Sequence, residues 1–371
     1  MSIFISIASY RDSVELEKTV DSLIENSDNP QNLRIIILSQ DRKRSHVDFS
    51  RYDNVELFKV DFRKARGAGW ARKRIMEEYK GEDFFFQIDS HERFAKSWDT
   101  KIVEMFNQAS SMAKTNKIIL SQYPEPYEPH TDGKDHYIKG NSSLWDRVSW
   151  TAVRNNWHGC WTGCRQEIED KTKPHITHSI LAGYVFASGS FVEEIPYDER
   201  ISFMGEELCI AIRAYTRGWK IYAPNEMLVW HFYKRRGESK PWTQMDDSVR
   251  DIKWVDLEME SKKTQELVLR GIEKGVYGIE DHDLYLEYQD LVGINFDEFY
   301  NKGISEKINK AALTEELDFL ESVKKSGWCS GGEHNQCETS GCECQCHPKE
   351  DEDEWFRDKY PEYDQSNTNN I

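Results

Sequence analysis

The sequence predicts an α/β fold with a mainly parallel sheet flanked by helices. Short apolar runs with the character of buried strands alternate with helical periodicity along the first 120 residues, and this alternation is typical of parallel sheets. One such run, DFFFQI at residues 83–88, leads directly into Asp89 and His91. Ligands of α/β sheets bind beyond the carboxyl ends of the strands, so we expect a site at this point.

The expected elements follow one another in a regular order. Residues 14–26, for example, carry apolar side chains at helical spacing, and Pro30 follows beyond the expected helix end. In the first third of the chain, strands are expected at 3–8, 34–39, 55–60, 83–88 and 117–121, and helices at 14–26, 68–80 and 97–112.

Residues 123–178 interrupt this pattern. They are rich in Pro, His, Trp, Gly and Asn and show little periodicity, so we expect long loops of the kind that carry substrate specificity. Beyond them the sequence predicts a strand and turn at 183–192, helices at 206–217 and 251–270, and strands at 218–223 and 227–233.

The sequence divides into three parts. Residues 1–300 hold the expected α/β elements and are predicted to form one catalytic domain. Residues 301–348 combine a short helix with a Cys- and His-rich segment, which we expect to form a small C-terminal extension. Residues 349–371 are acidic and poor in aliphatic side chains, so we expect a disordered tail.

The charge and the hydropathy argue against several classes of protein. A net charge of −17 disfavours nucleic acid as a partner, because nonspecific binding to nucleic acid needs a basic surface. No apolar run approaches the roughly 18 residues of a membrane span, so no membrane partner is expected. The N-terminal MSIFISIASYRD lacks the basic region of a signal peptide and is typical of a buried strand. We therefore expect a cytoplasmic protein with reduced cysteines.

Asp89 and His91 form the central candidate site. Alternate residues of an extended segment share a face, so the two side chains can bind one cation. A mixed oxygen and nitrogen pair suits Mn²⁺ and neighbouring divalent ions better than Ca²⁺, and such an ion would support a diphosphate leaving group. His231 ends a later apolar strand and could complete the shell. The alternatives are an Asp89 that caps a turn and a His231 that is a hydrogen-bonded core residue.

A second candidate metal site lies in the C-terminal extension. Soft ligands in a reducing compartment favour a structural Zn²⁺ ion, and a disulfide framework in an oxidising compartment is the alternative. The candidate ligands are Cys329, His334, Cys337, Cys342, Cys344, Cys346 and His347.

A series of segments in one order resembles a known family. The segments are IFISIASYRD, LSQD, ARGAGWARKRIMEEY, FFFQIDSHERFAKSWD, ILSQYP, FASGSF, IPYDERISFMGEELCIAIRAYTRGWKIYAP, VWHFY and YGIEDHDLYLEYQDLVGINF. The series resembles the glycosyltransferase family that includes the polypeptide (hydroxyproline) N-acetylglucosaminyltransferases. This resemblance implies a GT-A (Rossmann-like) fold, a UDP-sugar donor, retention of anomeric configuration, and a divalent metal held by Asp89, His91 and His231.

The resemblance also implies roles for further residues. Those expected to bind the nucleotide-sugar are Tyr10, Arg11, Asp12, Gln40, Asp41, Gly67, Arg72 and Ser90. Glu206 and Glu207 begin a helix, and one of them would contact the sugar or steady positive charge at its anomeric carbon; the helix dipole alone also favours carboxylates there. Gly189, Trp157 and Trp161 are candidates for contact with the acceptor, and core packing is the alternative for the two rings.

The sequence and the resemblance together predict a metal-dependent retaining glycosyltransferase. It would move a sugar from a UDP-sugar to a hydroxyl acceptor such as a protein, and the resemblance makes N-acetylglucosamine the first candidate. The alternatives are a nucleotide-sugar hydrolase or nucleotidyltransferase on the same fold, and a non-catalytic GT-A-like binding protein.

Overall fold

The computed structural model describes residues 1–129, 135–137, 144–150, 161–167, 170–233 and 249–301. The chain divides into two compact units: Met1–Phe232 with Ser239–Lys307, and Tyr233–Glu238 with Ile308–Ile371. The second unit lies, except for Tyr233, outside the described residues, and so do the expected Cys- and His-rich segment and the acidic tail.

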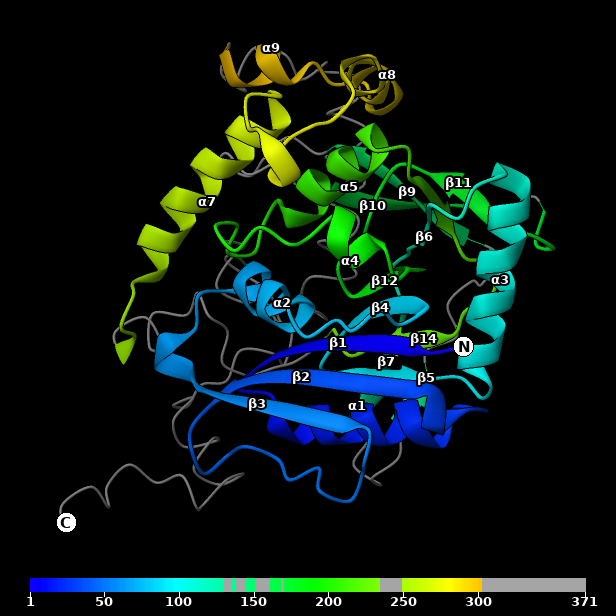
Figure 1. The fold of residues 1–371 in the computed structure, drawn as a ribbon, viewed down its shortest axis with the longest axis vertical. Helices are drawn as coiled ribbons and strands as arrows, with labels where there is room; N and C mark the ends of the chain where they lie inside the picture. Colours follow the sequence, from blue (N-terminus) through cyan, green and yellow to red (C-terminus); the bar gives the residue numbers. More distant parts are fainter. Residues whose placement is uncertain (130–134, 138–143, 151–160, 168–169, 234–248, 302–371) are drawn as a thin grey trace, which may run out of the picture. The chain divides into compact units, whose positions relative to one another are not determined.

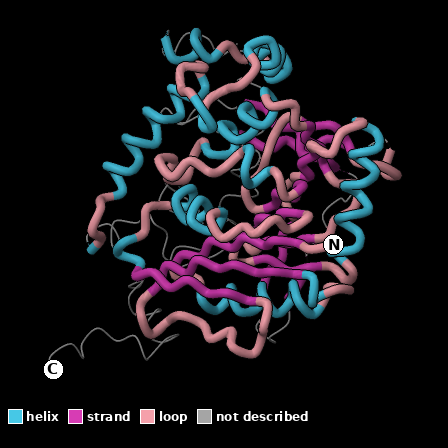
Figure 2. The backbone as a smooth tube through the Cα atoms, in the orientation of Figure 1, coloured by secondary structure: helices cyan, strands magenta, loops and turns pink. Residues whose placement is uncertain are grey.

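An eight-stranded sheet forms the centre of the first unit, with the strand order β11-β13-β6-β12-β4-β1-β2-β3 (Figures 1 and 2). Strands β3, β2, β1 and β4 are parallel to one another and β6 is parallel to β13, whereas β12 and β11 are antiparallel to their neighbours. The predicted, mainly parallel sheet is therefore confirmed. Its strands are β1 (Ile3–Tyr10), β2 (Leu33–Asp41), β3 (Val55–Asp61), β4 (Phe84–Asp89), β6 (Ile118–Leu120), β11 (His175–Thr177), β12 (Tyr184–Ser188) and β13 (Lys220–Ala223).

Helices cover both faces of this sheet, and each face has its own apolar core. Helices α1 (Ser13–Glu25) and α3 (Trp98–Ala113) bury their apolar side chains against one face. Helices α2 (Ala68–Met76), α4 (Phe191–Glu194) and α5 (Glu206–Thr216) pack against the other, and Figure 1 shows α1 and α2 on opposite sides of β1. The central strands β1, β2, β4, β6 and β12 are buried on both faces, which explains their nearly continuous apolar sequences. The outer helices are α7 (Trp254–Leu269), α8 (His282–Val292) and α9 (Phe296–Asn301).

A smaller four-stranded sheet, in the order β5-β14-β7-β8, continues from the end of β4. Strand β5 (Glu92–Phe94) begins three residues after Asp89 and pairs antiparallel with β14 (Val229–His231). In this pairing His231 lies opposite Glu92. The small sheet therefore brings a residue from late in the chain next to the carboxyl end of β4.

The prediction of long loops over residues 123–178 was wrong for part of that range. Five strands lie within it, including β7 (Glu125–Pro129) and β8 (Asp135–Tyr137), together with β9 (Leu144–Trp150), β10 (Trp161–Glu167) and β11. β7 contains two prolines, and β8 and β11 have only three residues each, so no alternating pattern develops. Strands β7 and β11 pair with β14 and β13, which are distant in sequence, so their formation is a tertiary effect.

The other elements that were predicted within the described residues are present with shifted ends, and the short helix expected in residues 301–348 lies outside them. The helix predicted at 68–80 ends at Met76, and α8 and α9 were not predicted. No helix in the described part of the chain is both long enough and apolar enough to cross a membrane.

Candidate active site

The carboxyl ends of three neighbouring strands lie along one edge of the large sheet. Asp89 ends β4 and pairs in register with Ala8 of β1. Tyr10, the last residue of β1, pairs with Gln40 of β2. This edge is where ligands bind in sheets of this kind, so the observed topology places Asp89 where the sequence predicted a site.

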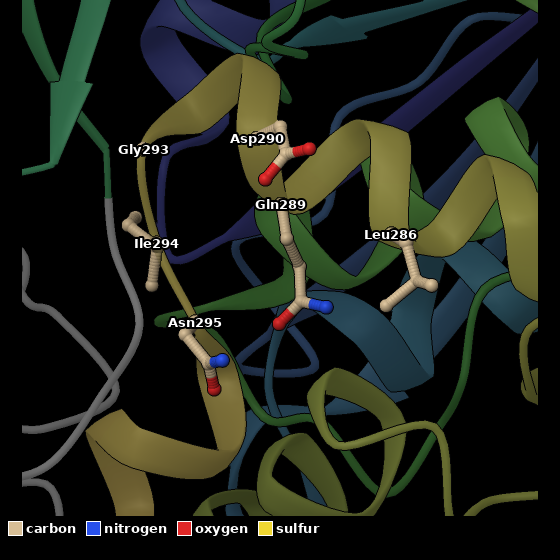
Figure 3. Close-up of a pocket in the computed structure, with 6 residues that line it drawn as sticks. All are labelled: Leu286, Gln289, Asp290, Gly293, Ile294 and Asn295. Carbon is tan, nitrogen blue, oxygen red and sulfur yellow. The ribbon is translucent and has the colours of Figure 1, made fainter.

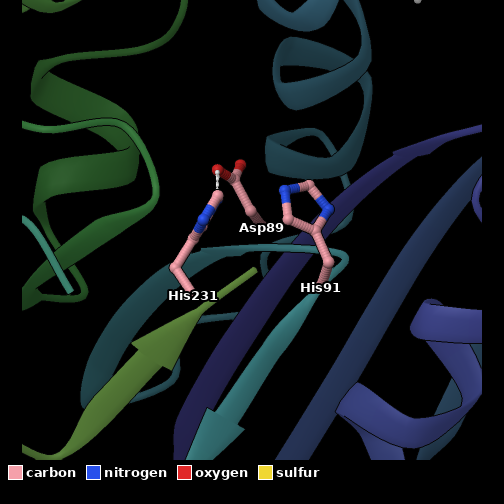
Figure 4. Close-up of side chains that lie close together, drawn as sticks. All are labelled: Asp89, His91 and His231. Atoms are coloured by element: carbon pink, nitrogen blue, oxygen red, sulfur yellow. Dashed lines mark ion pairs between the residues drawn. The ribbon is translucent and has the colours of Figure 1, made fainter. Parts of the chain in front are cut away.

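The side chains of Asp89, His91 and His231 converge at this edge (Figure 4). Each offers one ligand atom, and these atoms all lie within 4.8 Å of one another. His231 Nε2 is 3.3 Å from Asp89 Oδ2, and the two imidazole rings meet edge to face with their centroids 4.4 Å apart. The Asp89 side chain is 26% exposed, whereas both imidazoles are buried. One carboxylate and two imidazoles fit a first-row divalent cation.

Asp12 holds His91 in place. Asp12 is buried, and its Oδ2 atom lies 2.7 Å from His91 Nδ1 and accepts a hydrogen bond of 2.7 Å from Ser90 Oγ. Because Nδ1 donates to this carboxylate, Nε2 is the ring nitrogen that can serve as a ligand. The resemblance implied contact with the nucleotide-sugar for Asp12 and Ser90, and the structure places both against His91.

Arg72 connects two carboxylates at the same edge. From α2 its buried guanidinium donates to Asp89 Oδ1 at 3.0 Å and to Glu206 Oε1. Burial by itself would raise the pKa of Asp89, but the hydrogen bond from His231 and the charge of Arg72 hold it well below the usual range. Asp89 is therefore ionised, as a metal ligand must be.

Glu206 and Glu207 occupy the first turn of α5 but have different surroundings. Glu206 is buried against Arg72, and burial raises its pKa although the Arg72 charge opposes this. Glu207 is half-buried, and its Oε1 atom accepts a hydrogen bond of 2.7 Å from the Ala182 N–H. Burial raises the pKa of Glu207 to about 7 despite this hydrogen bond. Glu206 is thus a partner of Arg72, and Glu207 is the better candidate for contact with a ligand.

Glu92 and Gly183 also belong to this edge, and the sequence did not single out either. Glu92 is fully buried, and burial together with the Asp89 charge raises its pKa well above the usual range. Gly183 lies directly before β12 and faces both carboxyl groups: a methyl group added there would lie 2.8 Å from Asp89 Oδ2 and 3.2 Å from Glu92 Oε1. The lack of a side chain at residue 183 therefore leaves space beside Asp89.

Replacing Gly183 with alanine is expected to weaken the binding of a divalent cation by about tenfold or more, because the added methyl group would displace the Asp89 carboxylate. Disturbing the partners of a metal ligand typically costs 10- to 100-fold in affinity. The dissociation constant of Mn²⁺, measured by calorimetry, checks this. Gly189→Ala is the control: its methyl group would meet Glu82 O at 2.0 Å, away from Asp89. That variant should lose stability but keep its affinity for Mn²⁺. If Gly183→Ala binds Mn²⁺ as tightly as the wild type, the cation does not bind at Asp89.

The residues expected to hold the nucleotide lie together at the ends of β1 and β2. Arg11 has a left-handed backbone conformation (φ 47°) and donates its N–H to Gln40 O at 3.0 Å. Gln40 is buried, and its Oε1 atom has no hydrogen-bond partner among the described residues. Asp41 accepts a hydrogen bond from Ser13 Oγ. The expected grouping of Tyr10, Arg11, Gln40 and Asp41 is thus present.

Other predicted site residues lie elsewhere. Gly67 (φ 102°) packs against the backbone of Ser202, with 2.1 Å between an added methyl group and Ser202 O, so packing accounts for this glycine. The Gly189 N–H donates to Asp83 O, at the opposite end of β4 from Asp89. The structure therefore does not bring Gly189 to the candidate active site.

The structure does not place Trp157, Trp161 or the candidate zinc ligands at the site. Trp157 and all seven candidate zinc ligands lie outside the described residues. The backbone of Trp161 belongs to β10 and pairs with Trp150.

A separate pocket lies at the α8–α9 turn (Figure 3). It contains none of the candidate site residues, and the Gln289 side chain within it accepts a hydrogen bond from the Phe296 N–H. The pocket is lined by Leu286, Gln289, Asp290, Gly293, Ile294 and Asn295. Its lining side chains do not include a group of possible metal ligands like Asp89, His91 and His231.

Comparison with known proteins indicates a glycosyltransferase. A family model described as Glycosyltransferase (GlcNAc) matches residues 2–52 and 42–301. No curated protein matches the sequence significantly.

Two solved structures are compared with the chain, and the one with the higher TM-score establishes the fold. The chain is similar to a crystal structure of GalNAc-T7 with UDP, GalNAc and Mn²⁺, with a TM-score of 0.51 and 16% identity over 84% of this chain. It spans only 58% of the length of that protein. A crystal structure of S. aureus TarS 1–349 in complex with UDP-GlcNAc matches with a TM-score of 0.40 and 12% identity, over 72% of this chain and 73% of that chain. The GalNAc-T7 similarity confirms that the fold is of the GT-A type.

Proposed function

Because the chain belongs to the Glycosyltransferase (GlcNAc) family, we propose that it transfers a sugar from a UDP-sugar to a hydroxyl acceptor at the edge formed by β4, β1 and β2. The observation that carries this proposal is the convergence of Asp89, His91 and His231 within 4.8 Å. N-acetylglucosamine is the first donor sugar to test, because the family description names it. The related structures that contain UDP or UDP-GlcNAc agree with a uridine nucleotide donor.

The chain supplies a divalent cation site and a nucleotide site side by side. Asp89, His91 and His231 would hold the cation, Mn²⁺ being the first candidate, which offsets the negative charge on the departing diphosphate when bound. Asp12 fixes the ring of His91.

The uridine site would lie at the neighbouring strand ends. Tyr10, Arg11 and Asp41 lie around the base and ribose in this proposal. The buried Gln40 Oε1 atom can accept a hydrogen bond from the uracil N–H group, because no described residue donates to it. A buried acceptor without a donor is costly, so a ligand donor would stabilise it.

Glu207 would contact the transferred sugar. Its carboxylate can accept hydrogen bonds from sugar hydroxyls and stabilise positive charge at the anomeric carbon, while Arg72 offsets the charge of Glu206. Retention of configuration is part of the proposal, and no residue is given the role of a nucleophile.

The acceptor is a hydroxyl group in this proposal, with hydroxyproline of a protein as the first candidate from the sequence resemblance. Residues 123–178 would set acceptor specificity, with Trp157 and Trp161 as candidate contacts. A structural Zn²⁺ site at residues 329–347 would belong to a separate C-terminal extension at 301–348. Measuring zinc in the purified protein tests that part independently.

A donor screen tests the proposed function. Purified protein is incubated with Mn²⁺ and each UDP-sugar, with and without a pool of candidate acceptor proteins, and the released UDP is measured. Mass spectrometry of the pool then locates the added sugar. UDP release that needs the acceptor supports transfer, whereas equal release without acceptor indicates a nucleotide-sugar hydrolase. Absence of release with every donor and acceptor would contradict the proposal.

The pKa of Glu207, about 7, predicts a pH dependence. Ionised Glu207 accepts hydrogen bonds more strongly, so kcat/KM for transfer should rise with pH through about 7. In Glu207→Gln this rise should disappear, and the rate above pH 7 should fall by about 10- to 100-fold, the range for a lost charged hydrogen bond. A pH–rate profile of both proteins checks this. If the variant keeps the rise near pH 7, another group is responsible.

The stability of the folded protein should change with pH in the opposite sense to kcat/KM. The folded-state pKa of Glu207 is higher than the ordinary glutamate value of about 4.5, so folding favours its protonated form. Its destabilising effect therefore grows as pH rises from about 4.5 to about 7 and stays constant above. Glu207→Gln removes this penalty and should gain stability relative to the wild type as pH rises through this window.

A further inference from the structure

The Glu92 carboxyl group is fully buried, and no side chain of the described residues donates a hydrogen bond to it. Its exposed fraction is 0%, and the backbone N–H of Asp89 is the one hydrogen-bonding group beside it in the described part of the chain. A buried carboxyl group that is poorly satisfied is costly, and such groups in folded proteins normally bind a protein group, a water molecule or an ion. A single backbone N–H leaves most of the acceptor capacity of Glu92 unused.

The carboxyl group faces the candidate cation site. Glu92 follows His91 directly and lies opposite His231 in the pairing of β5 with β14. A methyl group added at Gly183 would lie 3.2 Å from Glu92 Oε1 and 2.8 Å from Asp89 Oδ2, so both oxygens border the same space. The Glu92 carboxyl group thus lies on the Asp89 side of the three candidate ligands, where the absence of a side chain at Gly183 leaves space.

A second buried polar group lies beside Glu92. The hydroxyl group of Tyr184, the residue after Gly183, is fully buried and has no hydrogen-bond partner among the described residues. It interacts electrostatically with Glu92. Two poorly satisfied polar groups in one buried region are what a bound polar ligand or water would stabilise.

We propose that Glu92 is a fourth group of the cation site, with its carboxylate facing the ion either directly or through one bound water. The inference rests on the proposed cation at Asp89, His91 and His231 and adds a residue that the Asp-x-His spacing does not include. Together with Asp89, it gives the site two carboxylates, which match the charge of a divalent ion. A second carboxylate also shifts the preference of the site from Zn²⁺ towards Mn²⁺ and Mg²⁺.

Glu92→Gln tests this directly, because glutamine keeps the size and loses the charge. Mn²⁺ binding to the purified full chain is measured by calorimetry. The variant is expected to bind Mn²⁺ about 10- to 100-fold more weakly, as for other supporting groups of metal sites, and to lose less affinity for Zn²⁺ than for Mn²⁺. If Glu92→Gln binds Mn²⁺ as tightly as the wild type, the proposal is wrong.

Asp99→Asn is the matched control. Asp99 is also a fully buried carboxylate, but it accepts hydrogen bonds from Ser27 Oγ and from the N–H groups of Asp28 and Asn29. Its substitution should lower stability and leave Mn²⁺ affinity unchanged. An equal loss of affinity in both variants would show a general effect of buried charge and overturn the role of Glu92.

A measurement on the unmodified sequence covers the case in which Glu92→Gln does not fold. The wild-type chain is labelled with ¹³C in its glutamate carboxyl groups and loaded with Mn²⁺, and electron–nuclear double resonance detects carbon near the ion. A ¹³C coupling that persists in Glu206→Gln and in Glu207→Gln supports Glu92 at the site, and its absence contradicts it. Failure of the wild type to bind Mn²⁺ at all would instead contradict the proposed cation site itself, so the two outcomes are distinguishable.

Discussion

Replacing Asp89 with asparagine is expected to reduce kcat/KM for sugar transfer by about 10³-fold, the largest loss of activity for any substitution at this site. A bound cation contributes several kcal/mol of charge stabilisation in a transition state, and a loss of about 4 kcal/mol corresponds to 10³-fold. Asp89 is the only carboxylate in the group of three ligands, and its low pKa keeps it ionised. Asparagine keeps the shape and the contact with Arg72 but not the charge.

The measurement combines turnover with binding. UDP release with the best donor gives kcat/KM, and calorimetry gives the affinity for Mn²⁺; both should fall together in Asp89→Asn. Asp99→Asn serves again as a control, since it removes a buried carboxylate that caps the loop before η1 (Pro30–Asn32). Full activity of Asp89→Asn with every donor would show that the catalytic site does not depend on a cation held there.

The part of the site that the sequence predicted is the part encoded locally. The run of apolar residues before Asp89 shows a strand that ends at a carboxylate, and the two-residue spacing puts His91 on the same face. His231 was identifiable because it also ends an apolar run. The structure then supplied the reason for their meeting, which is the pairing of β14 with β5.

The part that the sequence did not predict depends on contacts between distant segments. Asp12 supports His91 across 79 positions, and a strand-end aspartate offers no local signal for such a role. Glu92 points towards Gly183, which belongs to a segment that reaches it only through the pairing of β12 with β4. The two glycines that were predicted at the site were misleading. Close approach of the backbone explains both Gly67 and Gly189. The sequence does not distinguish a glycine that is required by such packing from one that is required by a ligand.

Replacing Arg72 with methionine is expected to destabilise the folded protein by about 3 to 5 kcal/mol near pH 8, the range for removing one partner of a buried ion pair. Arg72 is the only cation that donates to both Asp89 and Glu206 in the described structure, and all three are held at the sheet edge. Without Arg72, the neighbouring negative charges of Asp89 and Glu206 would have too little positive charge beside them. Urea unfolding curves of wild type and variant give the difference in free energy.

Lys73→Met is the control for this prediction, because it removes the same charge from the next residue of α2. Lys73 pairs with Glu77 at the surface, and such exposed pairs contribute about 1 kcal/mol or less. The deficit of Arg72→Met should also shrink as the pH falls. Without Arg72 the folded-state pKa values of Glu206 and Asp89 rise, the folded protein binds protons that the unfolded chain releases, and acidification then favours the folded state. If Arg72→Met costs no more than Lys73→Met at every pH, Arg72 does not hold these carboxylates together, and its charge must act on a ligand instead.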